Sequence, residues 1–183
     1  MSVEPVAADD VPPGPRTRSE RTADSRLLIL DAAVECLVSA GYAGASTLAV
    51  LLHPAWDMGV ICRPGSDCPQ VRTGGRPLVL VARNTAAGSA RATAAVNALA
   101  GQGVRVAVLA VVSDGLPDPV PAAYRFRLLT PRVGAMARIP FVPLLRAADD
   151  PALVVLPRKV RRALAEIRAE ALGMAGWAFP GTL

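Results

Sequence analysis

The chain has 183 residues, of which 52% are hydrophobic and 19% are charged, and its formal net charge is +5 at pH 7. This length suits one domain with tails. The strongest apolar runs, such as Val104–Val112, stop after about nine residues, far short of the roughly 20 that span a bilayer, so we expect no transmembrane segment. Nineteen arginines and one lysine, Lys159, carry the basic charge; we interpret this bias first as codon usage and only second as selection for phosphate contacts.

The first segment of the chain contains few apolar side chains. It is acidic at first, then proline-rich at Pro12–Pro15 and arginine-rich at Arg16–Arg21, with no hydrophobic signal sequence. We therefore expect a disordered tail over residues 1–25 and a cytoplasmic protein.

The next segment predicts short elements. The apolar run Leu27–Leu30 suits a short helix or an edge strand, and Val34–Val38 suits a strand. Ser46–Leu52 is predicted as a short helix that stops at His53-Pro54, because a residue before proline is disfavoured in a helix. Proline and glycine recur through His53–Arg76, which we predict as a long loop.

The second half alternates between strand and helix patterns. We predict strands at Pro77–Ala82, Val104–Val112 and Gly134–Ile139, and helices at Ala87–Ala100, Pro121–Leu129, Pro143–Ala147 and Pro157–Gly173. This alternation predicts an α/β fold, a mostly parallel β-sheet flanked by helices in a single small domain, with ligands at the carboxyl ends of its strands. We divide the chain into the tail 1–25, the α/β domain 26–152 and a C-terminal amphipathic basic helix with its tail, 153–183.

Cysteine and histidine give no metal or disulfide signal. Three cysteines, Cys36, Cys62 and Cys68, are an odd number, so we expect no disulfide framework. Cys62, Cys68 and His53 match no standard zinc spacing, and we interpret them as ordinary loop residues.

Acidic residues do not suggest catalysis either. Turn-like segments contain Asp114, Asp118, Asp149 and Asp150, which we interpret as turn or cap residues. His53 is the single histidine and lacks a nucleophilic serine motif, so we expect no catalytic triad.

Cations cluster at the start of the predicted C-terminal helix. They are Arg158, Lys159, Arg161 and Arg162. We interpret them first as the solvated face of a packed amphipathic helix; the alternative is a nucleic-acid or anionic membrane surface. Nucleic acid is a candidate partner through this helix or through the arginine-rich tail.

The segment Ala40–Thr47 resembles the deviant Walker A motif of ParA/MinD-like P-loop NTPases, and specifically of related proteins of actinobacterial type. The spaced glycines Gly41 and Gly44 and the pair Ser46-Thr47 are kept, whereas both lysines are replaced, by Ala40 and Ala45. The resemblance implies a P-loop NTPase-like fold, and Gly41, Gly44, Ala45, Ser46 and Thr47 form a candidate site for a phosphate or another anion.

This resemblance extends from Val34 to about Pro151. Val108–Asp114 resembles the strand that ends near the nucleotide base, and Ala137–Phe141 resembles the last strand with its IP motif. Arg83 stands where the family has the Walker B aspartate, so with the lysines also lost we expect no useful ATP hydrolysis and no required cofactor. Arg83 and Arg91 could replace the lost positive charge if they faced the loop, but an arginine in this place would repel Mg²⁺.

The resemblance implies a non-catalytic, P-loop-like interaction or regulatory partner of an unidentified protein, in a mobile-element or secretion-type system. The alternative within the same family is a weak nucleotide-binding ATPase of the partitioning class. In either case the candidate anion site lies after the first core strand.

A weaker local resemblance links the same segment to TetR-type regulators. Ile29–Ala33, Leu37, Gly41-Tyr42 and Ser46-Thr47 resemble the first helix and turn of their DNA-binding domain. It implies a DNA-binding transcriptional regulator with an all-helical ligand domain, yet Pro54 interrupts the segment where the helix pair would continue.

Overall fold

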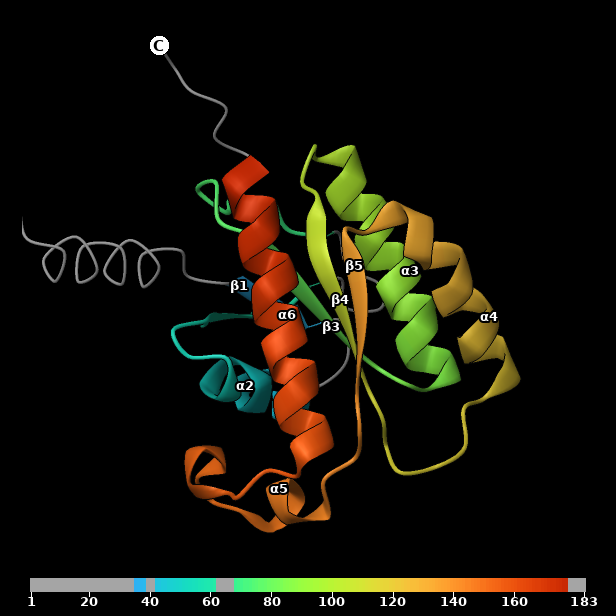
Figure 1. Cartoon of the computed structure of the whole chain (residues 1–183). Coiled ribbons are helices and arrows are strands. Elements are labelled where there is room, and N and C mark those ends of the chain that lie inside the picture. Colours follow the sequence, from blue (N-terminus) through green and yellow to red (C-terminus); the bar gives the residue numbers. More distant parts are fainter. Residues whose placement is uncertain (1–34, 39–41, 62–67, 178–183) are drawn as a thin grey trace, which may run out of the picture. The chain divides into compact units, whose positions relative to one another are not determined.

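Five parallel strands form one sheet, and helices cover both of its faces (Figure 1). The computed structural model describes residues 35–38, 42–61 and 68–177, all within a compact unit that runs from Ala32 to Leu183. In chain order the elements are β1 (Glu35–Val38), α2 (Tyr42–Leu51), β2 (Trp56–Val60), β3 (Leu78–Arg83), α3 (Ala86–Gly101), β4 (Val106–Val112), α4 (Val120–Leu129), the 3₁₀ helix η1 (Thr130–Arg132), β5 (Ala135–Ile139), α5 (Pro143–Ala147), the 3₁₀ helix η2 (Pro151–Leu153) and α6 (Arg158–Trp177). The predicted α/β fold class is confirmed.

The strand order is β2-β1-β3-β4-β5. This is one of the two common orders of doubly wound sheets, in which the chain first builds outward from β1 to one edge and then from β3 to the other. The reversal lies between β1 and β3. Ligands of such sheets bind outside the carboxyl ends of the strands at this switch point, which directs attention to the turns that follow β1 and β3.

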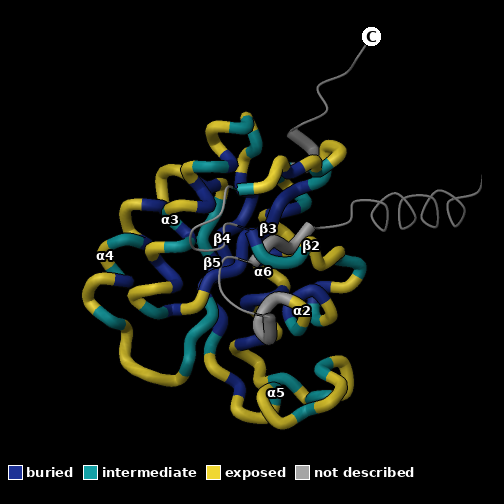
Figure 2. The backbone as a smooth tube through the Cα atoms, turned by 180° about the vertical axis from the view of Figure 1, so that it is seen from behind, coloured by how far each residue is buried: buried dark blue, intermediate teal, exposed yellow. Residues whose placement is uncertain are grey.

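Both faces of the central strands are buried, as the continuous apolar runs in the sequence predict. Val79 and Val81 of β3 face a core shared with α2 and α6, whereas Leu78 and Leu80 face a core shared with α3 and α4. Figure 2 shows the same division, with buried backbone concentrated in the strands and in the sides of the helices that face them. The two helical layers therefore hold the sheet from opposite sides.

The expected loop His53–Arg76 contains a strand. β2 pairs in parallel with β1 at the edge of the sheet, although its first three residues, Trp56–Met58, are exposed. Its apolar residues, Trp56, Met58 and Val60, alternate over only five positions in a segment rich in proline and glycine, and this part of the loop prediction is wrong.

The C-terminal helix is part of the domain rather than a segment beside it. α6 buries Val160, Ala163, Leu164, Ile167 and Ala171 in the core that it shares with α2. Its packed amphipathic character is confirmed.

The strand assignment of β4 bears on the TetR resemblance. Val106–Val112 is a buried interior strand of the sheet, between β3 and β5, so the described domain is not the all-helical structure that this resemblance implies. The segment 26–34, which carries the matching ILDAA letters, lies outside the described residues.

Candidate functional site

The turn between β1 and α2 carries the candidate anion site. Helix α2 begins at Tyr42, four residues before the predicted start at Ser46, so Gly44, Ala45, Ser46 and Thr47 belong to the helix. Gly41 lies outside the described residues. A phosphate cradle requires backbone N–H groups of a loop before the helix, and here only residues 39–41 separate β1 from α2. The predicted start of the helix is wrong, while the anion site itself stays a prediction.

Ser46 makes a contact that the Walker A comparison does not anticipate. Its hydroxyl donates a hydrogen bond of 2.6 Å to Oδ2 of Asp57 on β2, while Oδ1 of Asp57 accepts a bond of 2.8 Å from the backbone N–H of Gly59. Ser46 thus ties α2 to the edge strand of the sheet.

The turn between β3 and α3 is the better defined of the two. The N–H of Asn84 donates to the carbonyl of Val112 at 2.8 Å, which holds the end of β3 beside the end of β4. Thr85 caps α3, since its Oγ1 accepts from the N–H of Gly88 at 2.9 Å. A Cβ at Gly88 would lie 2.3 Å from the carbonyl oxygen of Arg83, so this close approach of helix and strand requires glycine.

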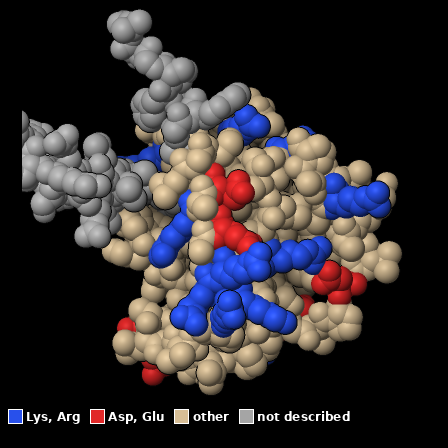
Figure 3. All heavy atoms as spheres, in the orientation of Figure 1, with Lys and Arg blue, Asp and Glu red and all other residues tan. Residues whose placement is uncertain are grey.

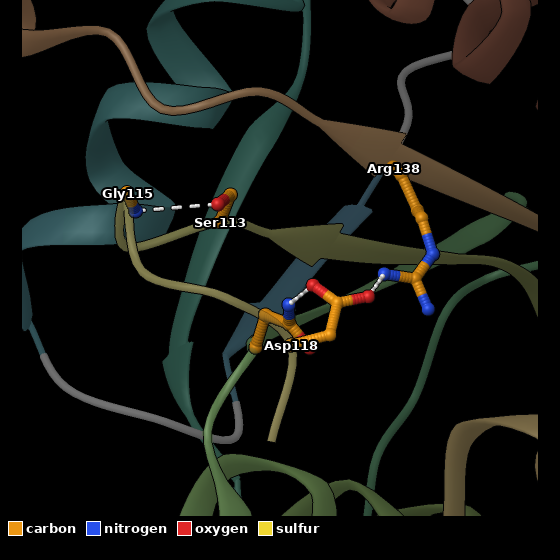
Figure 4. Close-up of polar contacts among 5 residues, drawn as sticks. Ser113, Gly115, Asp118 and Arg138 are labelled. Carbon is orange, nitrogen blue, oxygen red and sulfur yellow. Dashed lines mark hydrogen bonds and ion pairs between the residues drawn. The ribbon is translucent and has the colours of Figure 1, made fainter. Parts of the chain in front are cut away.

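A polar network joins the segments after β3 and β4 to β5. The side-chain amide of Asn84 donates from Nδ2 to Oδ1 of Asp118, and Arg138 on β5 donates from Nη1 to Oδ2 of Asp118 at 2.6 Å. Figure 4 shows the Asp118 carboxylate reaching Arg138. Both carboxylate oxygens are engaged, so Asp118 is a structural link between three segments, rather than the simple turn or cap residue predicted from sequence.

Asn84 also presents an acceptor without a partner. The residue is 2% exposed, and its Oδ1 has no hydrogen-bond partner among the described residues. The bond from Nδ2 to Asp118 fixes the orientation of the amide, because the flipped amide would place two acceptors against each other. The carboxyl edge of β3 therefore contains one buried acceptor that an N–H or O–H donor would satisfy.

The connection after β4 is held against the segment after β5. The N–H of Ser113 donates to the carbonyl of Ile139 at 2.9 Å, and Ser113 Oγ accepts from the N–H of Gly115 (Figure 4). Gly115 has a φ of +88°, and a Cβ there would lie 2.8 Å from the ring of Phe141. The positive φ favours glycine at this position, and a Cβ would also force the Phe141 ring to shift.

Asp114 and Asp150 match their predicted roles as turn and cap residues. Asp114 Oδ1 accepts from the N–H of Leu116, and Asp150 caps η2 by accepting from the N–H of Ala152. Within the described residues, no group of three or more His, Cys, Asp or Glu side chains is arranged to hold a metal ion.

Two arginines were candidates to replace the lost Walker lysine. Arg83 ends β3 with an exposed side chain, and Arg91 lies half-buried on α3, nearly two turns into the helix. A role for either arginine in place of the Walker lysine stays a prediction.

Cys68 departs from the prediction. It is disulfide-bonded, so its interpretation as an ordinary loop thiol is wrong. The expectation of no disulfide does not hold for this residue, while Cys62 lies outside the described residues. Sequence reasoning missed this bond because an odd number of cysteines does not show which two would pair.

The basic cluster of α6 lies on the outer face of that helix. Figure 3 shows Lys and Arg side chains gathered on the face that α6 covers, with acidic side chains beside them. Arg158, Lys159, Arg161 and Arg162 are exposed, and Arg162 pairs with Glu166 at 2.9 Å. None of the described helices is long and apolar enough to cross a membrane.

Searches against protein-family models, curated proteins and solved structures found no match to this chain.

Proposed function

We propose that the chain is a non-catalytic α/β domain, related to the ParA/MinD-like P-loop proteins, that acts as an interaction or regulatory partner in a mobile-element or secretion-type system. The observation that supports this best is which charged side chains lie at the carboxyl edge of the sheet and which partners they bond. An exposed arginine, Arg83, ends β3 in the Walker B place, and both oxygens of the neighbouring Asp118 are bonded to Asn84 and Arg138.

The chemistry of phosphoryl transfer makes this arrangement informative. A P-loop NTPase needs a lysine on the β- and γ-phosphates and a carboxylate that supports Mg²⁺. Here the chain has alanine in both lysine positions, and the carboxylate of Asp118 already holds the loops together. A polar network of this kind suits a domain that keeps a fixed shape for binding rather than one that turns over a nucleotide.

The test is a titration of the purified chain with ATP, ADP and GTP, with and without Mg²⁺, followed by thermal unfolding and calorimetry. We expect no saturable binding and no hydrolysis. A ligand at one hundred times its Kd would stabilise the protein by about 2.7 kcal/mol, so true binding would be visible.

The matched control is the double variant Ser46→Ala/Thr47→Ala. Saturable, Mg²⁺-dependent stabilisation by a nucleotide that this variant abolishes would overturn the proposal in favour of the partitioning-class ATPase. Stabilisation that survives in the variant would point to binding elsewhere on the domain.

A second candidate function, nucleic-acid binding through α6, is favoured by its exposed cations. Arg158, Lys159 and Arg161 have exposed side chains on the first two turns of the helix. Duplex DNA affinity that falls steeply with salt, and that weakens in the Arg158→Ala/Lys159→Ala/Arg161→Ala variant, would support this candidate. Binding that this variant leaves unchanged would reject it.

A further inference from the structure

Helix α4 has apolar side chains on two opposite faces. The inner face is buried against the sheet and consists of Ala122, Phe126 and Leu129. The outer face is exposed and consists of Val120 at 81%, Tyr124 at 64% and Leu128 at 54%. Residues four apart line up on one side of a helix, so these three form a continuous stripe. A surface helix is normally apolar on its core side alone, and a second apolar side indicates a second packing partner.

A groove continues the stripe. It has a volume of about 350 Å³ between α3 and α4, and its walls are Ala90 and Thr93 of α3, Arg125, Leu128 and Leu129 of α4, and Arg132 of η1. Leu128 belongs to both the stripe and the groove, so the two are parts of one area. We call Val120, Tyr124 and Leu128 together with this groove the α3–α4 surface.

The charged residues of α3, α4 and η1 are all basic. The sequences of α3, α4 and η1 contain Arg91, Arg125, Arg127 and Arg132 and no aspartate or glutamate. Arg127 and Arg132 are exposed, whereas Arg125 donates from Nη1 to the carbonyl of Ala86 at 3.1 Å. A partner that covers the apolar stripe must bring carboxylates to its margin, because an uncharged or basic partner would leave these guanidinium groups desolvated and unpaired.

The shape of the surface favours a helix. The two α3 residues that line the groove, Ala90 and Thr93, have small side chains. Small side chains let the axis of a neighbouring helix come close, and a helix packs its ridges into the groove between two others. An amphipathic helix also matches the spacing of Val120, Tyr124 and Leu128, since its own apolar residues recur at three and four positions.

We propose that the α3–α4 surface binds an acidic amphipathic helix of a partner protein, with apolar residues of that helix against Val120, Tyr124 and Leu128 and its carboxylates facing Arg127 and Arg132. This inference rests on the proposed interaction role and names the chemistry of the partner. A second copy of the chain fits less well, because a two-fold contact through this surface would bring like-charged arginines together.

The experiment uses the full chain and two fluorescein-labelled synthetic peptides. One is a helix-forming amphipathic peptide of leucine and glutamate; in the other, each glutamate is replaced by lysine. Fluorescence anisotropy should show saturable binding of the acidic peptide, weakened by salt, and no binding of the basic one. The Leu128→Glu variant should lower the affinity at least about tenfold, because it removes an apolar contact that the bound peptide would bury and its carboxylate repels the peptide.

The matched control is Leu153→Glu, at a residue that is 81% exposed on η2 and therefore equally free to change without disturbing the core. It should leave the affinity unchanged, and circular dichroism should show that both variants are folded. Equal binding of the two peptides, no binding of the acidic one, or equal affinities of the two variants would overturn the inference.

Vesicles of anionic phospholipid and a labelled DNA duplex complete the test. The inference is wrong if the acidic peptide does not bind, one of these two ligands does, and Leu128→Glu abolishes that binding. The surface would then recognise lipid or nucleic acid. Failure here is distinct from failure of the non-catalytic role, because the latter is decided by nucleotide binding in the Ser46→Ala/Thr47→Ala comparison.

Discussion

The two helical layers of the domain have similar inner faces and different outer faces. Toward the sheet, α2 and α6 on one side and α3 and α4 on the other bury aliphatic residues and one phenylalanine, Phe126. Toward solvent, α6 carries charges of both signs, including the pair Arg162–Glu166, whereas α4 carries Val120, Tyr124 and Leu128 with arginines alone. The first layer suits contact with water, and the second suits contact with another macromolecule.

This difference separates what stabilises the domain from what it does. Substitutions on an inner face should change the free energy of unfolding, while substitutions on the outer face of α4 should change binding and leave stability nearly unaltered.

Phe126 and Tyr124 provide the sharpest contrast within one helix. Phe126 is 1% exposed, so Phe126→Ala should lower the free energy of unfolding by about 3–5 kcal/mol, through lost burial and a cavity. Tyr124→Ala removes an aromatic ring of similar size from the outer face and should stay within about 0.5 kcal/mol of the parent. Urea denaturation followed by circular dichroism measures both. A loss above 2 kcal/mol for Tyr124→Ala would mean that the stripe already packs within the chain.

Two glycines of α3 test the junction of strand and helix. Gly88→Ala would place a Cβ 2.3 Å from the carbonyl of Arg83, and we expect a loss of about 1–3 kcal/mol, since neither backbone can yield easily. Gly101→Ala at the other end of α3 meets no atom within 4 Å and should stabilise the helix by up to about 1 kcal/mol. Thermal unfolding of the pair gives the sign of each change, and two changes of the same sign would contradict the packing at Gly88.

Asp118 tests the network at the carboxyl edge of the sheet. Asp118→Ala leaves the buried amide of Asn84 without its acceptor and should cost about 1–3 kcal/mol. Arg138→Ala removes the half-exposed end of the same network and should cost no more than about 1 kcal/mol. Equal losses for the two variants, measured by urea denaturation, would show that the ion pair rather than the buried amide dominates.

Much of the fold follows from local patterns in the sequence. β3 and β4 are continuous apolar runs that are buried on both faces, and α6 has an apolar stripe with a proline at its start, so both kinds of element could be predicted. β2 could not, because its alternation of apolar residues lasts only five positions and its formation depends on pairing with β1.

The candidate site was harder to predict than the fold. The sequence drew attention to Ser46 and Thr47 through a motif, but α2 begins earlier, at Tyr42, although Tyr42 and Gly44 have weak helix propensity. The link between Asn84, Asp118 and Arg138 joins residues that are far apart in the chain and become neighbours only because parallel strands end at one edge. No local pattern in Asp118 distinguishes it from an ordinary turn residue.

Substitutions on the outer face of α6 should change the free energy of unfolding least. Arg162 and Glu166 form an exposed pair at positions i and i+4, and such pairs contribute about 0.2–0.5 kcal/mol. Arg162 also lies near the positive end of the helix dipole among Arg158, Lys159 and Arg161, so its removal relieves repulsion that offsets the lost pair. We therefore expect Arg162→Ala to change stability by less than about 0.5 kcal/mol and Glu166→Ala to be the more destabilising of the two. A double-mutant cycle at low and high salt measures the coupling. A coupling above 1 kcal/mol that persists in high salt would show that charge pairs stabilise this face of α6. The outer faces of α6 and α4 would then differ in the kind of interaction they make, and not in whether they face solvent or a partner.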